Sequence, residues 1–243
     1  MSMPVAILAG GLATRLGAVT ASIPKALVDV GGRPFAEHQL QWLKGEGVSH
    51  VVFCVAHLGS MIQDALGDGA RFGLRIEYVF DGAPLLGTAG ALKRALPVLG
   101  DRFFVLYGDS LLTCPLGPVE QAFRESGRAA LMTVYRNDDR FDRSNVLFED
   151  GRLQRYDKMS RTENMRHIDY GLGVLTSRAL AMIPEGHPFD LAALYQRLLA
   201  DNDLIGFEVH ERFYEIGSPD GLEETRAFLA SRAEADRRTN APS

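Results

Sequence analysis

The stretch PVAILAGGLATRLGAVTASIPKAL, residues 4–27, decides how the chain is interpreted. Its first five residues, 4–8, form a short apolar run, which is typical of a buried strand. The run leads directly into Gly10 and Gly11, which carry no Cβ and therefore let backbone amides approach an anion closely. The sequence thus predicts a strand followed by an anion-binding loop.

Polar residues of the same loop support this interpretation. Thr14 adds a hydroxyl donor, and Arg15 adds a guanidinium that suits phosphate oxygens. Pro24 then stiffens the backbone before Lys25, which presents an ammonium group. The loop matches neither the Rossmann fingerprint nor Walker A, because its glycines do not follow G-x-G-x-x-G and no G-K-[ST] occurs.

Strands and helices alternate through the first half of the chain. Strand-like apolar runs cover 50–56, 74–80, 102–108 and 129–135, and helix-like segments cover 36–47, 60–66, 87–96 and 118–127. Alternation of this kind predicts βαβ units and a mostly parallel sheet that binds ligands at the carboxyl ends of its strands.

The pattern changes after Arg136. Asp150-Gly151 lies between two alternating runs and predicts a hairpin within 144–158. Further segments are a strand at 165–175, a helix at 190–200, a second hairpin at 204–216 and a last helix from Pro219 to Leu229. We therefore predict a single domain over 1–232 and a flexible tail over 233–243. Its nucleotide-binding half, about 1–135, would merge with an antiparallel half, about 136–222.

Composition limits the classes of function. The chain has 243 residues, 46% of them hydrophobic, and a net charge of -5 from 26 basic and 31 acidic residues. This charge argues against a nucleic-acid surface. No apolar run is long enough to cross a membrane, and no signal segment is recognisable. Two cysteines without metal-ligand spacing suggest a reduced, cytoplasmic, soluble protein. The sequence leaves a homo-oligomer open.

The segment YGDS, residues 107–110, permits two chemistries. Ser110 could be the nucleophile of a GDSL-type ester hydrolase, or Asp109 could hold a metal ion at the carboxyl end of a strand. A serine nucleophile needs a base, and such hydrolases place theirs in a late D-x-x-H that this sequence lacks. Asp109 lies where a parallel sheet binds ligands, so we favour the metal-binding interpretation.

The loop and its surroundings resemble sugar-1-phosphate nucleotidylyltransferases, which join an NTP to a sugar 1-phosphate and release pyrophosphate. Their signature G-G-x-G-T-R-(L/M)…P-K is matched except at Ala13, where glycine is usual. Further matching motifs follow in order: PLLGTAGAL at 84–92, YGDS at 107–110, YDK at 156–158, IDYGLGVL at 168–175 and FYEIGSPDGL at 213–222. The resemblance covers roughly 4–222. It is to short members such as heptose-1-phosphate guanylyltransferases and N-acetylmuramate-1-phosphate uridylyltransferases.

The resemblance implies a fold and a set of site residues. The fold would be a three-layer, Rossmann-like α/β fold of the GT-A-like type, with a mixed, mostly parallel sheet and an antiparallel sugar-binding part. The implied nucleotide-binding residues are Leu8, Ala9, Gly10, Gly11, Thr14, Arg15, Lys25, Gly87, Thr88 and Gly108. The implied sugar-phosphate residues are Asp157, Lys158, Asp169 and Gly171. Arg15, Lys25 and Asp109 would be catalytic, and Asp109 with Glu215 would hold Mg²⁺. The family usually has asparagine at position 169 and aspartate at position 215.

Three classes of function follow from the sequence. The leading class is a Mg²⁺-dependent nucleotidylyltransferase acting on an NTP and a sugar 1-phosphate by in-line attack on the α-phosphorus. The second is the GDSL-type hydrolase with Ser110 as nucleophile. The third is a non-catalytic sensor of nucleotides or sugar phosphates. The sequence identifies neither the base nor the sugar.

Overall fold

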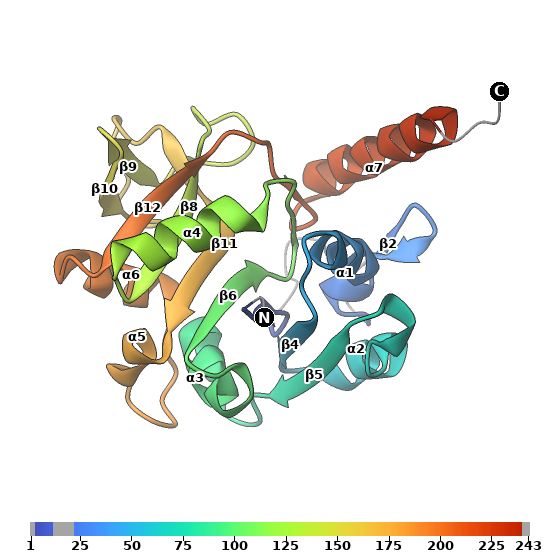
Figure 1. Ribbon diagram of the computed structural model, residues 1–243, viewed down its shortest axis with the longest axis horizontal. Helices are drawn as coiled ribbons and strands as arrows, with labels where there is room; N and C mark the ends of the chain where they lie inside the picture. The colour runs from blue at the N-terminus through green and yellow to red at the C-terminus, as the bar shows by residue number, and fades with distance from the viewer. Residues whose placement is uncertain (1–2, 12–21, 240–243) are drawn as a thin grey trace.

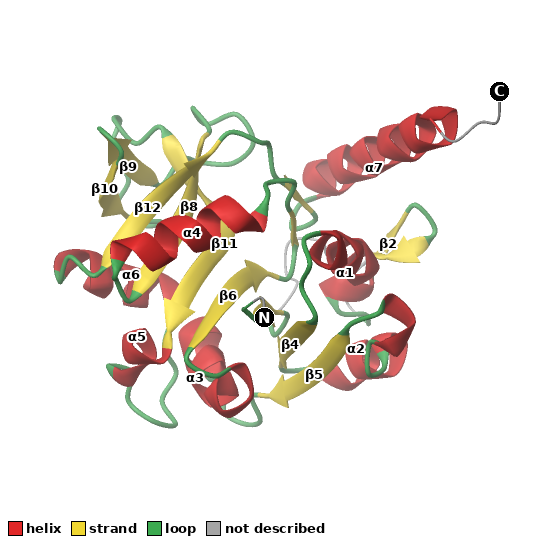
Figure 2. Cartoon of the chain, viewed as in Figure 1, coloured by secondary structure: helices red, strands yellow, loops and turns green. Residues whose placement is uncertain are grey.

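A computed structural model describes residues 3–11 and 22–239 of the chain. Its centre is one large mixed sheet with helices on both faces (Figure 2). The strands of this sheet are β1 (Val5–Leu8), β4 (His50–Val55), β5 (Arg75–Phe80), β6 (Arg102–Tyr107), β8 (Ala130–Arg136), β9 (Val146–Glu149), β10 (Arg152–Tyr156), β11 (His167–Thr176) and β12 (Leu204–Val209). Two short pairs stand apart from it, β2 (Asp29–Val30) with β3 (Arg33–Pro34), and β7 (Ser110–Leu111) with β13 (Tyr214–Glu215).

The helices form the outer two layers. They are α1 (Phe35–Gly45), α2 (Gly59–Leu66), α3 (Gly87–Leu99), α4 (Leu116–Ser126), α5 (Ser177–Ala181), α6 (Leu191–Ala200) and α7 (Pro219–Thr239), with short 3-10 turns at Lys25–Leu27 and Ala70–Phe72. One core cluster packs α1, α2 and α4 against the sheet, and a second packs α3, α5 and α6. The three-layer α/β architecture predicted from the sequence is confirmed.

The first half of the chain builds the parallel part of the sheet. The strand order β5-β4-β1-β6 is parallel throughout. β1, β4 and β6 are apolar at nearly every position, because helices cover both of their faces, whereas the edge strand β5 is only partly buried. Their carboxyl ends therefore meet at one edge of the sheet, as the alternation of strands and helices predicts.

The second half adds antiparallel strands. β11 pairs antiparallel with β6 on one side and with β8 on the other. Its register against β8 shifts between Asp169 and Gly173. These two residues are four positions apart on β11, but their partners on β8 are only two positions apart. This bulge lets β11 bend beside the end of β6. The hairpin predicted at Asp150-Gly151 is confirmed, since both residues have positive φ and connect β9 to β10.

The second predicted hairpin, 204–216, is wrong. β12 pairs in parallel with β8, whereas β13 leaves the large sheet and pairs with β7. No glycine or asparagine that could form a tight turn separates the two strands. Instead Phe213, between them, packs edge-on against the rings of Tyr135, Phe141 and Tyr170. This packing carries the chain across to the end of β6.

The last helix is longer than predicted. It continues to Thr239 rather than ending at Leu229, and its distal half projects from the body of the molecule (Figure 1). A third, smaller core cluster holds its first half. That cluster contains Val28, Val30, Phe35, Leu111, Ile216 and Leu222, with Tyr214, Phe228 and Leu229 packed against it. The end of the described chain is thereby attached to its beginning.

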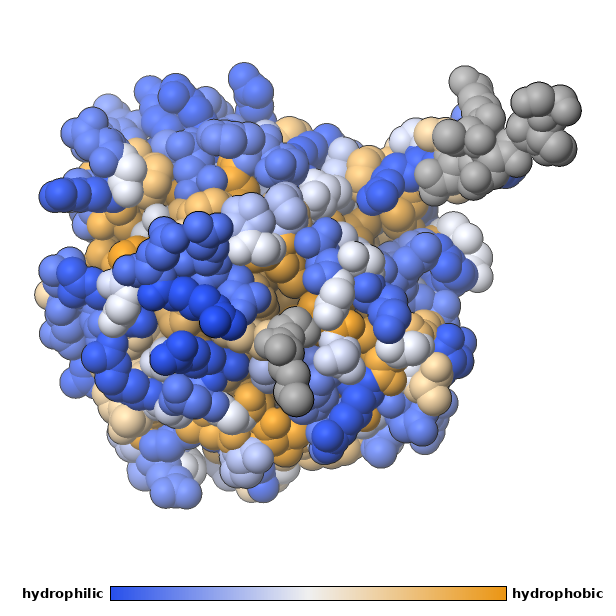
Figure 3. All heavy atoms as spheres, viewed as in Figure 1, coloured by the Kyte–Doolittle hydropathy of each residue, from blue (hydrophilic) through white to orange (hydrophobic). Residues whose placement is uncertain are grey.

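The surface is mainly polar. Figure 3 shows hydrophilic side chains spread over the visible face, with apolar groups in the recesses between elements. The exposed large hydrophobic residues of the described part are Phe80, Leu85 and Met159. Within the same part, no helix combines the length and apolar character that crossing a bilayer requires.

Candidate functional site

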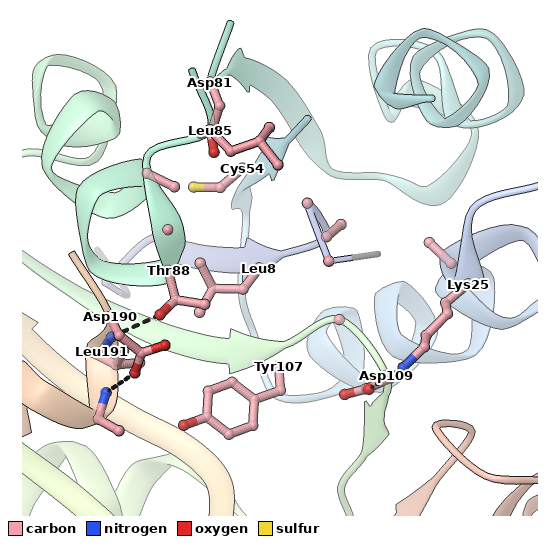
Figure 4. A pocket seen from close by; sticks show the side chains of 18 of the residues that line it. Leu8, Lys25, Cys54, Asp81, Leu85, Thr88, Tyr107, Asp109, Asp190 and Leu191 are labelled. Atoms are coloured by element: carbon pink, nitrogen blue, oxygen red, sulfur yellow. Dashed lines mark hydrogen bonds and ion pairs between the residues drawn. The ribbon is translucent and has the colours of Figure 1, made fainter. Parts of the chain in front are cut away.

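A cavity of about 480 Å³ lies at the carboxyl ends of the four parallel strands. Each strand supplies a residue at or just beyond its end: Leu8 from β1, Cys54 from β4, Asp81 after β5 and Tyr107 from β6 (Figure 4). Most of the residues proposed for the nucleotide line it: Leu8, Ala9, Gly10, Gly11, Lys25, Gly87, Thr88 and Gly108. Asp109 and Lys158 line it too. The cavity therefore lies at the edge of the sheet that the sequence predicts as the ligand-binding edge.

Thr14 and Arg15 lie outside the described residues. Their proposed contacts with the phosphates stay a prediction from the sequence.

Lys25 and Asp109 form an ion pair at one end of the cavity. The Nζ of Lys25 lies 3.0 Å from Oδ2 of Asp109, although 84 positions separate the two residues in sequence. Gly108 makes this corner possible, because a Cβ at that position would lie 2.5 Å from the carbonyl oxygen of Leu8. The corner therefore requires glycine where the first loop passes close to the end of β6.

Glu215 reaches the same corner from the far end of the chain. Its carboxylate accepts hydrogen bonds from the backbone N–H of Gly217 and from the hydroxyl of Ser218, 2.5 Å away. A Cβ built on Gly217 would lie 2.7 Å from Glu215 Oε2, 3.3 Å from Asp109 Oδ2 and 3.5 Å from Lys25 Nζ. Two carboxylates and one ammonium group thus surround Gly217.

This donor set fits a divalent cation that takes further ligands from phosphates. Within 3–11 and 22–239 no group of three or more His, Cys, Asp or Glu side chains gathers to enclose a metal ion. Mg²⁺ does not need such an enclosure, because it is commonly held by one or two carboxylates together with substrate oxygens. Asp109, which lines the cavity, and Glu215, which does not, provide such a pair beside Gly217.

Lys158 also lines the cavity, and Asp169, Tyr107 and Tyr156 lie around its ammonium group. Its Nζ is 3.8 Å from Oδ2 of Asp169, whose side chain is only 4% exposed. The same oxygen accepts hydrogen bonds from the hydroxyls of Tyr107, at 2.6 Å, and Tyr156, at 3.1 Å. Burial and the nearby Asp169 charge raise the pKa of Tyr107, so this hydroxyl stays protonated and donates.

Asp169 and Gly171 do not line the cavity itself. The N–H of Gly171 donates to Oδ1 of Asp169 over 3.1 Å, so both belong to the bulge of β11. Asp157 does not line it either. Its Oδ1 accepts hydrogen bonds from the amides of Met159 and Ser160, at 2.9 and 2.7 Å, and these bonds lower the pKa of its carboxyl group. The structure thus places Lys158 in the lining of the cavity. Asp157 and Asp169 lie outside the lining and accept hydrogen bonds from neighbouring groups of the chain.

Gly87 and Thr88 lie where α3 begins, and both line the cavity. A Cβ on Gly87, whose φ is +69°, would come within 2.8 Å of the Phe189 carbonyl oxygen. Thr88 Oγ1 accepts a hydrogen bond of 2.7 Å from the N–H of Leu191, which ties α3 to α6. Asp190 caps α6 by accepting from the N–H of Ala192. Hydrogen bonds within the chain thus hold the start of α3 against the start of α6 on this side of the cavity (Figure 4).

Sequence reasoning missed three residues that shape the site. Gln39 is buried on α1, and its Nε2 donates to the carbonyls of Tyr107 and Ser110, on either side of the Gly108-Asp109 corner. A polar residue on the apolar face of the predicted helix was the available signal. Tyr107 supports Lys158, and Asp81 follows β5. Asp81 shares with Asp109 its position at the end of an apolar strand, so the same rule could have identified it.

Ser110 has no base. It is buried in β7, beneath Gly171, whose Cβ would lie 3.0 Å from its Oγ. None of the hydrogen bonds among the described residues joins Ser110 to a histidine, and all six histidines are described. Within the described part of the chain, Ser110 therefore lacks the base that a serine nucleophile requires.

These features define a class: an α/β protein with a cavity between a glycine-containing first loop and the carboxyl ends of parallel strands. Sequence comparison makes the class specific. The model of the nucleotidyl transferase family matches residues 5–143, and the chain belongs to that family.

Relatives and solved structures agree with this assignment. The chain is 29% identical to the UTP–glucose-1-phosphate uridylyltransferase of a Synechocystis strain, over 94% of this chain and 64% of that protein. It is 28% identical to the mannose-1-phosphate guanylyltransferase catalytic subunit beta of Xenopus tropicalis, over 89% of this chain and 62% of that protein. The chain thus spans less than two thirds of the length of these relatives. Over 111 residues, 46% of this chain and 48% of that protein, it is 40% identical to the N-acetylmuramate alpha-1-phosphate uridylyltransferase of Neisseria meningitidis.

The fold is also that of HddC from Yersinia pseudotuberculosis complexed with GMP-PN. The two share a TM-score of 0.77 at 22% identity, over 94% of this chain and all of that one. The Rossmann-like, GT-A-type fold predicted from the resemblance is thereby confirmed.

Proposed function

We propose that the protein transfers a nucleotidyl group from an NTP to a sugar 1-phosphate, giving an NDP-sugar and pyrophosphate. One observation carries the proposal: the Lys25–Asp109 ion pair and Lys158 line one cavity together with Gly10 and Gly11 of the first loop. Membership of the nucleotidyl transferase family supports it. So do the names of the relatives, which are sugar-1-phosphate uridylyl- and guanylyltransferases.

The reaction has to overcome repulsion between anions. Two unit charges 4 Å apart repel by about 4 kcal/mol at an effective dielectric constant near 20, and an NTP and a sugar phosphate bring several such pairs together. In the proposed reaction a sugar phosphate oxygen attacks the α-phosphorus in line. The bond from the α-phosphorus to the bridging oxygen breaks, and pyrophosphate leaves with that electron pair. No protein nucleophile is required.

The chain's residues would then bind and orient. Lys25 would neutralise the α-phosphate as charge develops, and the amides at Gly10 and Gly11, with Thr14 and Arg15, would hold the outer phosphates. Lys158 would bind the phosphate of the sugar. Asp109 and Glu215 would hold a divalent cation, for which we propose Mg²⁺, and that ion would supply the remaining positive charge.

The two halves of the chain would divide this work. Residues of about 1–135 would bind the nucleotide and residues of about 136–222 the sugar phosphate, because Lys25 and Lys158, one from each half, both line the cavity. We propose the cytoplasm as the compartment, supported by two buried cysteines that are both free thiols. Homo-oligomerisation stays a prediction.

The test is Mg²⁺-dependent pyrophosphate release from a matrix of NTPs and sugar 1-phosphates. Asp109→Asn should lower kcat by about 100-fold or more, because it removes a carboxylate that would hold the cation. Ser110→Ala is the matched control at the adjacent residue and should leave turnover nearly unchanged. If Ser110→Ala abolishes activity while Asp109→Asn keeps it, a hydrolase is indicated. Nucleotide binding without pyrophosphate release from any pair would indicate a sensor.

A further inference from the structure

Asp81 lies at the end of the cavity away from Lys25 and Asp109 (Figure 4). It follows β5 directly and is only 6% exposed. Its Oδ2 accepts a long hydrogen bond, 3.4 Å, from the N–H of Leu86. Its Oδ1 is buried and has no hydrogen-bond partner in the described part of the chain. A buried carboxylate oxygen without a donor is unfavourable, and Asp81 is one of the residues that line the cavity.

The surroundings leave this carboxylate largely uncompensated. Arg94 is the nearest cation, but it donates to the backbone carbonyl of Asp81, at 2.6 Å, rather than to the side chain. Burial raises the pKa of Asp81, and the Leu86 amide and Arg94 lower it by smaller amounts. Burial and the Asp81 charge together raise the pKa of the Cys54 thiol to about 12, so Cys54 stays neutral.

Apolar groups beside Asp81 suit a flat ring. Leu85 lines the cavity and is 42% exposed, which is unusual for leucine in this chain, and the neighbouring Phe80 is 41% exposed. Ala9 and Cys54 provide further apolar lining. A planar base would cover the exposed Leu85 side chain while its edge meets Asp81.

We propose that Asp81 selects guanine as the base of the nucleotide, accepting hydrogen bonds from the ring N1–H and the exocyclic amino group. This inference rests on the proposed function and identifies the base of the NTP, which the proposed function does not specify. A carboxylate only accepts hydrogen bonds, so it matches an edge that carries donors.

Guanine is the common base with two adjacent donors on one edge. The N3–H of uracil or thymine lies between two carbonyl oxygens, which would face the carboxylate unfavourably. The amino groups of cytosine and adenine each lie beside a ring nitrogen that accepts. A site built around a buried acceptor discriminates strongly against bases that do not supply the matching donors.

The experiment measures Kd by calorimetry for GTP, inosine triphosphate, UTP, CTP, ATP and dTTP, without any sugar. Inosine triphosphate is GTP without the 2-amino group, so the GTP-to-inosine ratio isolates one hydrogen bond. The wild-type protein should bind GTP about tenfold or more tightly than inosine triphosphate, as expected for a hydrogen bond to a charged group. Asp81→Asn should largely remove that ratio, because an amide replaces one acceptor by a donor.

Asp190→Asn is the matched control. It removes a negative charge from the same cavity but keeps an oxygen to cap α6, so the GTP-to-inosine ratio should stay as in the wild type. Tighter binding of UTP or dTTP than of GTP by the wild-type protein would overturn the inference without use of any variant. An unchanged ratio in Asp81→Asn would overturn it too. A guanine preference without pyrophosphate release from any sugar 1-phosphate would instead overturn the proposed function and leave base selection by Asp81 standing.

Discussion

Individual carboxylates in and around this cavity have different surroundings, and their hydrogen bonds distinguish them. Asp109 faces an ammonium group, Glu215 is held by Gly217 and Ser218, and Asp169 is buried under two tyrosine hydroxyls. A carboxylate that already accepts two phenolic hydrogen bonds is poorly placed to bind a sugar directly. It is well placed to orient Lys158, so we propose Asp169 as a positioning residue.

Asp169→Asn tests this role. The amide keeps an oxygen for Tyr107 but loses the charge opposite Lys158, which is itself 45% exposed. The KM for the sugar 1-phosphate should rise about two- to fivefold, as expected for a partly exposed ion pair, while the KM for the NTP stays unchanged. Lys158→Met should raise the same KM further. A lower melting temperature with both KM values unchanged would show that Asp169 only supports the fold.

Asp81 should make stability depend on pH in an unusual direction. Burial raises its pKa above the ordinary value of 3.8, so its favourable contribution is complete below that value and is lost as pH rises through the folded-state pKa. At neutral pH the wild-type protein therefore retains an unfavourable buried charge. Asp81→Asn should be more stable than the wild type, and urea unfolding should show a gap that widens from about pH 4 upward.

Asp157→Asn provides a control of opposite sign. Backbone hydrogen bonds from Ser160 and Met159 lower the pKa of Asp157, so its contribution is present at neutral pH and is lost on acidification. That variant should be less stable than the wild type at neutral pH, and the difference should shrink as pH falls. A gap for Asp81→Asn that stays constant with pH would contradict the assignment of its pKa.

At the scale of elements, α1 holds the Gly108-Asp109 corner through one side chain. Gln39→Leu keeps the approximate volume but removes the donor to the carbonyls of Tyr107 and Ser110. The free energy of unfolding should fall by about 1–3 kcal/mol, and kcat should fall as the corner loosens. Gln41→Leu is the control on the same helix. Gln41 is exposed, so its replacement should change stability by no more than about 0.5 kcal/mol. Equal effects of the two changes would show that α1 does not position the corner.

The elements also show which parts of the fold the sequence could predict. The hairpin at Asp150-Gly151 is local, because both turn residues adopt the positive φ that their types favour. The parallel strands follow from apolar runs of strand length between helices. The separation of β12 from β13 depends on contacts of Phe213 with Tyr135 and Tyr170, which lie far away in sequence. The alternation of apolar and polar residues within 204–216 carries no information about such long-range contacts.

The candidate site likewise contains residues that the sequence could predict and residues that it could not. Lys25, Asp109 and Lys158 could be identified because charged residues in matching motifs stand at the ends of predicted elements. The contact of Asp169 with Tyr107 could not, since a bulge in β11 brings the two together across 62 positions. Gln39 stands out as a polar residue on the apolar face of its helix, but its partners Tyr107 and Ser110 lie 68 and 71 positions away in the sequence.

At the scale of the whole molecule, the last helix completes the site that the first loop begins. The hydroxyl of Thr225 donates to the backbone carbonyl of Glu215 over 2.9 Å, and the ring of Phe228 stacks on Tyr214 at 3.9 Å between centroids. Arg226 donates to the carbonyl of Asp29, beside the segment that carries Lys25. These contacts fix Glu215 against Asp109 by joining the two ends of the described chain.

Two truncations distinguish the first half of α7, which we expect to hold Glu215 in place, from the half that projects from the molecule. Ending the chain after Ser231 keeps Leu222, Thr225 and Phe228, so the melting temperature should change by about 2 °C or less, and turnover should persist. Ending it after Ser218 removes those contacts and exposes apolar surface of the third cluster, which should lower the free energy of unfolding by about 5 kcal/mol. Pyrophosphate release and thermal melts measure both effects. If the shorter chain melts like the longer one and remains active, then α7 does not hold Glu215 in place, and the second carboxylate of the proposed cation site has to be sought elsewhere.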